Sequence, residues 1–125
     1  MIYGIGIDLC SIRRVQNIKD LNKFANKILT SGEIKHLDTL DQKNSLNYLA
    51  KQFAAKEALS KALGTGLIGD VKLNLIEIDR DQSGKPYIKM NDHMKTLLSK
   101  IGVNSTFVSL ADDSDFAVAT VILER

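Results

Sequence analysis

The sequence is poor in the residues that mark secreted, fibrous or disordered proteins. Its 125 residues contain one cysteine, one proline, eight glycines and no tryptophan. The single thiol, Cys10, cannot form an internal disulfide or a thiolate cage for a metal ion, which excludes a disulfide-rich scaffold or a zinc finger. Scarce proline, with 44% hydrophobic and 26% charged residues, excludes a collagen-like or disordered chain. We expect one globular domain spanning residues 1–125.

Long hydrophobic runs are also absent. The longest uninterrupted apolar stretches are a few residues long, whereas a membrane-spanning helix needs about 20. The N-terminal stretch MIYGIGIDLC has no basic segment ahead of its apolar residues, as a secretion signal would have. We therefore expect a soluble cytoplasmic protein that is not exported and does not act at a membrane.

Neither charge nor aromatic content is high enough to indicate nucleic-acid binding. The formal net charge is +2, and aromatic residues make up 6% of the chain, which leaves few rings on which bases could stack. The cations are concentrated in residues 13–27 and the acids in residues 104–125. Lysines at helical spacing are normal on a solvated face, but this one-sided excess favours docking of an acidic partner. The cations that we expect to contact this acidic partner are Arg14, Lys19, Lys23 and Lys27.

Hydrophobic periodicity predicts an α+β fold, with a largely antiparallel sheet packed on a long helix. The predicted order of elements is β-α-α-α-β-β-α-β-β. Three helices are expected to begin after the capping residues Thr30, Ser45 and Asn91. The strands are predicted over residues 2–9, 71–80, 86–90, 106–111 and 115–123, and the helices over residues 12–29, 31–40, 46–63 and 92–101.

The first predicted strand carries an acid on a glycine-bearing face. Its side chains alternate between a face with Gly4, Gly6 and Asp8 and an apolar face that we assign to the core. The apolar face consists of Tyr3, Ile5, Ile7 and Leu9. Because glycines let a ligand or another backbone approach closely, Asp8 is a candidate functional residue. Its structural alternative is to cap a helix entered near Ser11.

Glu57 is the second candidate carboxylate. At about 100° per residue it lies roughly 20° from Leu46 on the helical wheel, within the apolar stripe that contains Phe53. A buried carboxylate is costly unless a cation or hydrogen-bond donors meet it, and Lys61 four residues on is one local partner. Together, Asp8 and Glu57 are typical of a Mg²⁺ site that waters and a substrate phosphate complete.

The end of the same helix carries groups suited to a diphosphate. The ammonium groups of Lys56 and Lys61, the Ser60 hydroxyl and the backbone N–H groups of the segment Gly64-Thr65-Gly66 are possible donors. Such a glycine segment is more often only a helix stop. The segment Ser83-Gly84-Lys85-Pro86 is first of all a turn, although Lys85 is a further phosphate donor. His36 and His93 are predicted to be solvated.

Four segments of the sequence match a known family in their order along nearly the whole chain. The chain closely resembles the small bacterial type of 4′-phosphopantetheinyl transferase, the holo-(acyl-carrier-protein) synthase family. The F-A-x-K-E-A…K-A-x-G-T-G pattern is quite specific for that superfamily. The four segments are Ile5-Gly6-Ile7-Asp8 followed by Arg13-Arg14; Phe24-Ala25-Asn26-Lys27-Ile28-Leu29-Thr30; Phe53-Ala54-Ala55-Lys56-Glu57-Ala58 running to Lys61-Ala62-Leu63-Gly64-Thr65-Gly66; and Ser83-Gly84-Lys85-Pro86.

The resemblance implies transfer of phosphopantetheine from coenzyme A to a serine of apo acyl-carrier protein, with Mg²⁺ required and adenosine 3′,5′-bisphosphate released. It implies fatty-acid synthesis as the pathway and a symmetric trimer with active sites at subunit interfaces. The implied roles are metal binding by Asp8 and Glu57, catalysis with Lys61, coenzyme A binding by Ser60, Lys61, Gly64, Thr65, Gly66, Gly84, Lys85 and Pro86, and carrier-protein docking on Arg14, Lys19, Lys23 and Lys27.

Two positions depart from the family pattern. Many members have an arginine where this chain has Gln52, and a histidine where it has Asp112. These departures favour an alternative, a module that binds coenzyme A or carrier protein without transfer, whereas the retained Asp8, Glu57 and Lys61 favour an enzyme. The base that accepts the serine proton is open at this stage, between a metal-bound water, Asp8 and Asp112.

Overall fold

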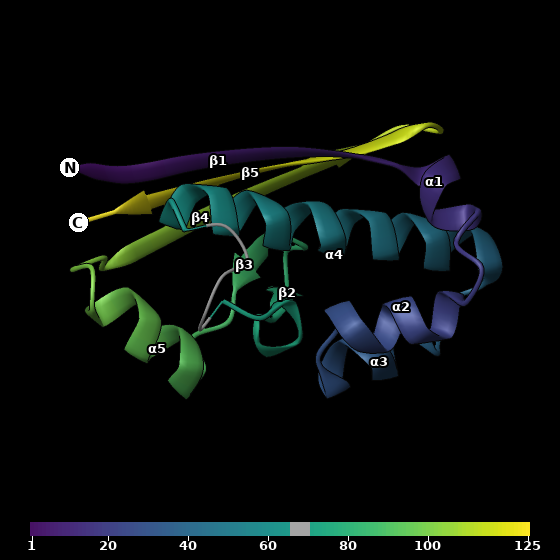
Figure 1. Cartoon of the computed structure of the whole chain (residues 1–125), viewed down its shortest axis with the longest axis horizontal. Coiled ribbons are helices and arrows are strands. Elements are labelled where there is room, and N and C mark those ends of the chain that lie inside the picture. Colours follow the sequence, from purple (N-terminus) through teal and green to yellow (C-terminus); the bar gives the residue numbers. More distant parts are fainter. Residues whose placement is uncertain (66–70) are drawn as a thin grey trace.

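The computed structural model describes residues 1–65 and 71–125. A three-stranded antiparallel sheet, in the order β1-β5-β4, lies against the long helix α4 (Figure 1). Helices α2, α3 and α5 and the two-stranded sheet β2-β3 lie on the other side of α4 from β1, and α1 lies at the end of β1. The predicted α+β class with antiparallel pairing is confirmed. The elements are β1 (Ile2–Ser11), α1 (Ile12–Gln16), α2 (Leu21–Ile28), α3 (Ser31–Leu37), α4 (Gln42–Leu63), the 3₁₀ helix η1 (Leu73–Leu75), β2 (Ile78–Arg80), β3 (Pro86–Ile88), α5 (Asp92–Ser99), β4 (Ser105–Asp112) and β5 (Phe116–Glu124).

Helix α4 begins earlier than the sequence indicated. Asp41, not Ser45, is its N-cap, because the Asp41 carboxylate accepts the backbone N–H of Asn44. The helix ends as predicted at Gly64, whose φ of 81° satisfies the left-handed C-cap position. Although α4 has 22 residues, neither it nor any other described helix is apolar enough to cross a membrane.

The predicted helix over residues 12–29 is two helices. Ser11 caps α1, and the Asp20 carboxylate caps α2 by accepting the backbone N–H of Lys23. Because an N-cap residue has non-helical dihedral angles, Asp20 interrupts a periodicity that otherwise runs on. The four cations predicted to dock a partner are therefore spread over α1, the connection and α2, and do not form one helical stripe.

The predicted strand over residues 71–80 is also shorter than expected, and its first part forms η1. Backbone carbonyls of η1 accept side chains instead of strand partners: Leu73 O accepts Lys56 Nζ, and Leu75 O accepts Asn91 Nδ2. Only Ile78–Arg80 pairs as a strand, with β3. The observed order of elements therefore differs from the predicted order at two places. One predicted helix is divided into α1 and α2, and η1 precedes β2.

The two faces of β1 are the reverse of the prediction. Its glycine face packs on α4, and a Cβ atom at Gly6 would lie 1.7 Å from the carbonyl oxygen of Ala58, while one at Gly4 would lie 2.0 Å from that of Ala62. These glycines therefore set the close approach of β1 to α4. The apolar side chains on the other face of the strand are exposed by about 60%: Ile5 58%, Ile7 60% and Leu9 62%.

The exposed apolar surface extends across the sheet. Ile5 is in register with Ile122 on β5, which pairs in turn with Phe107 on β4, and Phe107 is 50% exposed. We call this surface, with Ile7 and Leu9, the outer sheet face. Helix α4 covers the opposite face of the same sheet (Figure 1). A continuous apolar surface of this kind is typical of an interface.

Candidate active site

The contact between β1 and α4 brings together three predicted catalytic residues. Lys61 Nζ lies 3.1 Å from the Asp8 carboxylate and donates to the Ile7 backbone carbonyl at 2.9 Å. The Lys61 side chain is 54% exposed, whereas that of Asp8 is only 17% exposed. Lys61 therefore pairs with Asp8 instead of with Glu57, and Ser11 instead of Asp8 caps the adjoining helix.

Glu57 is half-buried, one helical turn before Lys61. Burial is the main cause that raises the pKa of Glu57, and the negative charge of Asp8 raises it further, while Lys61 opposes both effects. The two carboxylates are thus close enough to repel each other through a partly dry environment. A cation shared by Asp8 and Glu57 would relieve that repulsion, so the donor set fits a hard divalent metal ion.

The fully buried charged residue of α4 is Lys56, not Glu57. Its side chain is 0% exposed, so the prediction that Lys56 can donate to a diphosphate is wrong. Lys56 Nζ donates to the Glu33 carboxylate, to Ile28 O at 2.6 Å and to Leu73 O at 3.1 Å. Burial lowers the pKa of Lys56, and the adjacent Glu33 charge opposes this. The helical wheel predicted that Glu57 is the buried charged residue of this helix, whereas the fully buried one is its neighbour Lys56.

The other residues at the end of α4 that were predicted to bind coenzyme A differ in their exposure to solvent. Ser60 is buried, and its hydroxyl donates to Glu57 O at 2.8 Å within the helix. Gly64 and Thr65 are exposed at the end of the helix, and Gly66 lies outside the described residues. Whether these residues bind coenzyme A stays a prediction.

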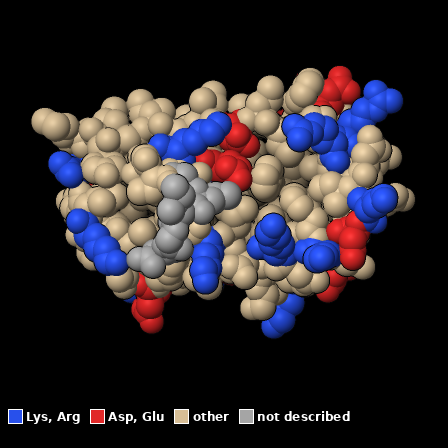
Figure 2. All heavy atoms as spheres, in the orientation of Figure 1, with Lys and Arg blue, Asp and Glu red and all other residues tan. Residues whose placement is uncertain are grey.

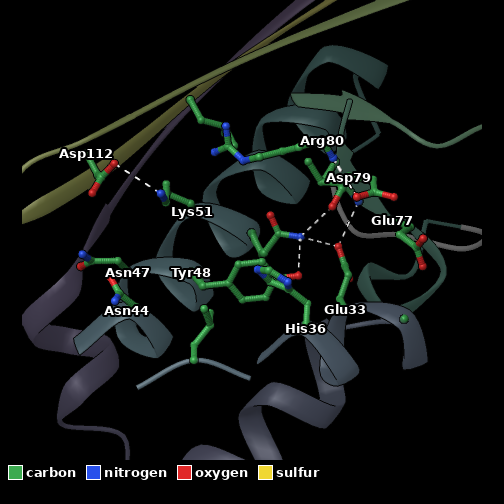
Figure 3. Close-up of a pocket in the computed structure, with 15 residues that line it drawn as sticks. Glu33, His36, Asn44, Asn47, Tyr48, Lys51, Glu77, Asp79, Arg80 and Asp112 are labelled. Carbon is green, nitrogen blue, oxygen red and sulfur yellow. Dashed lines mark hydrogen bonds and ion pairs between the residues drawn. The ribbon is translucent and has the colours of Figure 1, made fainter. Parts of the chain in front are cut away.

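A separate cavity of about 730 Å³ lies between α3, α4, β2 and β4 (Figure 3). Its lining includes Tyr48, Lys51 and Gln52 from α4, but not Asp8, Glu57 or Lys61. Nine residues at about 100° each separate Tyr48 from Glu57, which places them on opposite sides of α4. The cavity and the carboxylate pair of one chain therefore face in different directions.

Two predicted site elements border this cavity. Arg80 lines it and donates from Nη1 to Gly84 O at 2.7 Å, which attaches the turn Gly84-Lys85-Pro86 to its rim. Asp112 lines the cavity and forms an ion pair with Lys51, with 3.4 Å between carboxylate and ammonium (Figure 3). Asp112 therefore belongs to the cavity and not to the site at Asp8, and the turn at Gly84 is linked to the cavity through Arg80.

Sequence reasoning missed several cavity residues. Lys51 and Tyr48 lie on α4 before the family motif, and no local pattern distinguishes them from ordinary helix residues. His36, predicted to be a solvated bystander, is exposed but lines the cavity with its ring 4.9 Å from that of Tyr48. His93 is only half-exposed, and its Nε2 has no hydrogen-bond partner within the described part of the chain.

Comparison with known proteins decides the family. The model of the 4′-phosphopantetheinyl transferase superfamily matches residues 4–121. The chain belongs to the 4′-phosphopantetheinyl transferase superfamily. It is 41% identical to a holo-[acyl-carrier-protein] synthase of Buchnera aphidicola, with 98% of each chain covered.

Solved structures of superfamily members match the whole fold. The holo-[acyl-carrier-protein] synthase of Neisseria meningitidis superimposes with a TM-score of 0.92 at 38% identity, covering 100% of both chains. The Bacillus anthracis holo-(acyl-carrier-protein) synthase in complex with CoA (3′,5′-ADP) gives 0.84 at 36% identity, covering 99% of this chain and 97% of that one. The predicted fold and the predicted class of enzyme, a phosphopantetheinyl transferase, are confirmed.

The cationic surface of this superfamily member is accessible. Arg14, Lys19, Lys23 and Lys27 are all exposed. Figure 2 shows Lys and Arg side chains gathered over the end of the molecule that carries α1 and α2. Because these side chains project from three consecutive segments, they form a broad cationic area and not a narrow ridge. We call this area the cationic surface.

The two departures from the family pattern have defined environments in this transferase. Gln52 is buried and donates to the Glu33 carboxylate and, at 3.1 Å, to Ile78 O. Its amide is therefore committed to the interior. Asp112 is paired with Lys51, so the charge of this pair is balanced at the cavity.

Proposed function

We propose that the chain transfers the 4′-phosphopantetheine group of coenzyme A to a serine of apo acyl-carrier protein, in the cytoplasm and as a step of fatty-acid synthesis. The products are holo-acyl-carrier protein and adenosine 3′,5′-bisphosphate. The observation that carries the proposal is the convergence of Asp8, Glu57 and Lys61 at the contact of β1 with α4, in a member of this superfamily. Relatives named holo-[acyl-carrier-protein] synthase, one of them in complex with coenzyme A, support it.

Asp8 and Glu57 would hold Mg²⁺ in this reaction. Two carboxylates fill only part of the octahedral shell of Mg²⁺ and would leave positions for water and the substrate diphosphate. Among the described residues no group of three or more His, Cys, Asp and Glu side chains is arranged to hold a metal. The bound metal would neutralise charge on the diphosphate. Lys61 then supplies a second positive charge near the departing bisphosphate, with its ammonium held in place by Ile7 O.

The attacking serine must lose its proton to a base, and the positions of Asp8 and Asp112 bear on the residue that we propose for this role. Asp112 borders the cavity, whereas Asp8 lies beside Lys61 on the other side of α4. Asp112 can therefore act only on a site that a neighbouring copy completes. Asp8, or water beside it, is the base available within one chain.

We propose that the active protein is a homotrimer with each active site shared between two copies. The outer sheet face is apolar and exposed in a single chain, which favours burial against another copy. The cavity and the carboxylate pair lie on opposite sides of α4, so a long substrate can contact both kinds of surface only if they come from different copies.

The trimer is tested by Ile5→Lys, in the middle of the outer sheet face. An unpaired ammonium at a buried interface costs at least about 3 kcal/mol, roughly a hundredfold in the association constant. We expect a monomer by light scattering and loss of transfer. Met90→Lys, 39% exposed and away from this face, is the matched control. A trimeric Ile5→Lys variant would contradict the assignment of this face.

Docking of the acidic carrier protein on the cationic surface is tested by Lys23→Glu with Lys27→Glu. We expect kcat/KM for the carrier protein to fall about tenfold at low salt, and the difference to shrink as salt screens the charges. The control carries the same charge change at exposed Lys95 and Lys100, on α5 and at its C-cap, at the other end of the molecule from α1 and α2 (Figure 1). Equal effects of the two double variants would show that only net charge matters.

The transfer itself is tested by intact-mass spectrometry of apo acyl-carrier protein incubated with the chain and coenzyme A. We expect a mass gain of one phosphopantetheine with Mg²⁺ and none with excess chelator. No gain in either condition would favour the alternative, a module that binds coenzyme A or carrier protein without transfer. A gain that survives the chelator would remove the metal from the proposal.

A further inference from the structure

Lys56 is a fully buried cation that the proposed reaction does not use. It directly precedes Glu57 on α4, and successive residues on a helix point about 100° apart. Lys56 therefore projects into the layer formed by α2, α3 and η1, while Glu57 faces the β1 side. One short stretch of α4 thus connects the carboxylate pair to the layer that carries part of the cationic surface.

The contact of Lys56 with α2 is at the end of that helix. Lys56 Nζ donates to the backbone carbonyl of Ile28, the last residue of α2, at 2.6 Å. A cation at this position also interacts favourably with the negative end of the helix dipole. One turn earlier, Phe24 packs on Phe53 of α4 with ring centroids 5.5 Å apart. A polar and an apolar contact together fix α2 against α4.

Glu33 holds the Lys56 ammonium in this position. One carboxylate oxygen accepts Lys56 Nζ and the backbone N–H of Thr30, and the other accepts Gln52 Nε2 and the backbone N–H of Ile78. Glu33 is 3% exposed, and its oxygens are fully engaged. The Lys56 side chain therefore has little freedom to change direction, and it transmits the position of α4 to α2.

We propose that Lys56 is a positioning residue that sets the distance between the α2 part of the cationic surface and Glu57. This inference rests on the proposed function, in which carrier protein docks beside Lys23 and Lys27 and presents its serine to the site at Glu57. Lys23 and Lys27 directly precede Phe24 and Ile28, the residues through which α2 contacts α4. A displacement of α2 would leave docking intact but misplace the serine, and misplacement by about 1 Å can cost roughly a hundredfold in rate.

The test separates positioning from stability with two variants. Lys56→Met alone leaves the Glu33 charge buried without its cation and is expected to destabilise the fold. Lys56→Met combined with Glu33→Gln removes both charges, while glutamine at position 33 can still form the capping box with Thr30. We expect this double variant to keep the oligomeric state of the unsubstituted protein and to have a higher urea midpoint than Lys56→Met alone. The midpoint should stay below that of the unsubstituted protein, because the amide nitrogen of the new glutamine cannot accept Gln52 Nε2 and the Ile78 N–H. Lys43→Met, on the exposed start of α4, is the control.

For the double variant we expect kcat with carrier protein to fall about tenfold or more. The Kd values for carrier protein and for coenzyme A should stay within about twofold of those of the unsubstituted protein, because both binding surfaces remain. The Lys23→Glu, Lys27→Glu protein should show the opposite pattern, with weaker carrier binding and a smaller change in kcat. This contrast is one that a purely structural role would not produce.

Recovery of kcat in the double variant would overturn the inference, because the pair would then only stabilise the fold. Parallel loss of coenzyme A affinity would also overturn it, because the site at Glu57 itself would be disturbed. If the unsubstituted protein fails to transfer phosphopantetheine in the same assay, the proposed function fails and this inference with it. A defect confined to the variant bears on Lys56 alone.

Discussion

Glu57→Gln is expected to reduce turnover by about two orders of magnitude or more, with the fold intact. The substitution keeps the size of the side chain and removes the negative charge that the proposed metal site needs. Because burial and Asp8 already raise the pKa of Glu57, loss of this charge should stabilise the protein slightly when no metal is bound. Single-turnover transfer to carrier protein, with urea unfolding in parallel, measures both effects.

Asp38→Asn provides the control for Glu57→Gln. Asp38 is exposed at the end of α3, so its neutralisation changes net charge equally without touching the contact of β1 with α4. We expect near-unchanged turnover for this variant. Turnover of Glu57→Gln close to that of the control would exclude Glu57 as a metal ligand, and an excess of Mg²⁺ that restores turnover would support it.

Gly6→Ala is expected to destabilise the protein by about 3 kcal/mol or more, the upper end of the usual cost of overpacking. The new Cβ would lie 1.7 Å from Ala58 O, 2.7 Å from Ala58 C and 2.8 Å from Ala62 N, all of them backbone atoms. Backbone atoms inside a long helix cannot rotate away, so β1 and α4 must separate. The separation would also move Asp8 away from Glu57 and reduce transfer. Urea unfolding at fixed protein concentration gives the loss of stability.

Gly102→Ala distinguishes a steric clash from a conformational cost. Gly102 has a φ of 70°, and its nearest neighbour to an added Cβ is Arg125 Nε at 3.8 Å. An alanine there has space but must adopt a left-handed conformation, which costs about 1–2 kcal/mol. We expect this variant to unfold at a lower urea concentration but to keep its transfer activity. Equal losses of activity in both variants would argue against a special role for the contact at Gly6.

Much of the fold followed from local signals in the sequence. The N-cap at Thr30 and the glycine stop at Gly64 were predicted from local sequence, and both are present. Errors occurred where two local signals competed. Asp20 is itself a good N-cap residue, but the apolar periodicity on both sides of it favoured one continuous helix.

The orientation of β1 could not be predicted from its alternation alone. An apolar face indicates burial against something, and the sequence does not say whether that is the chain's own helix or another surface. Gly4 and Gly6 were expected to let a ligand or another backbone approach closely, and the backbone of α4 occupies that space. Closer attention to the four small residues Ala54, Ala55, Ala58 and Ala62, all buried on α4, would have indicated a tight helix–strand contact.

The candidate site was only partly accessible to sequence reasoning. Asp8, Glu57 and Lys61 converge because strand and helix pack together, and the family motif pointed to all three. The pairing of Lys56 with Glu33 joins residues 23 positions apart, and no local pattern indicates it. The same holds for the cavity, whose lining comes from α3, α4, β2 and β4.

The contact of β1 with α4 limits which substitutions this sequence can accept during evolution. A larger residue at Gly6 meets the carbonyl oxygen of Ala58, which every amino acid carries, so no replacement at position 58 can compensate for it. Gly4 stands in the same relation to Ala62. A pair of compensating substitutions is therefore impossible along this contact, and variation between descendants of this chain must accumulate away from it.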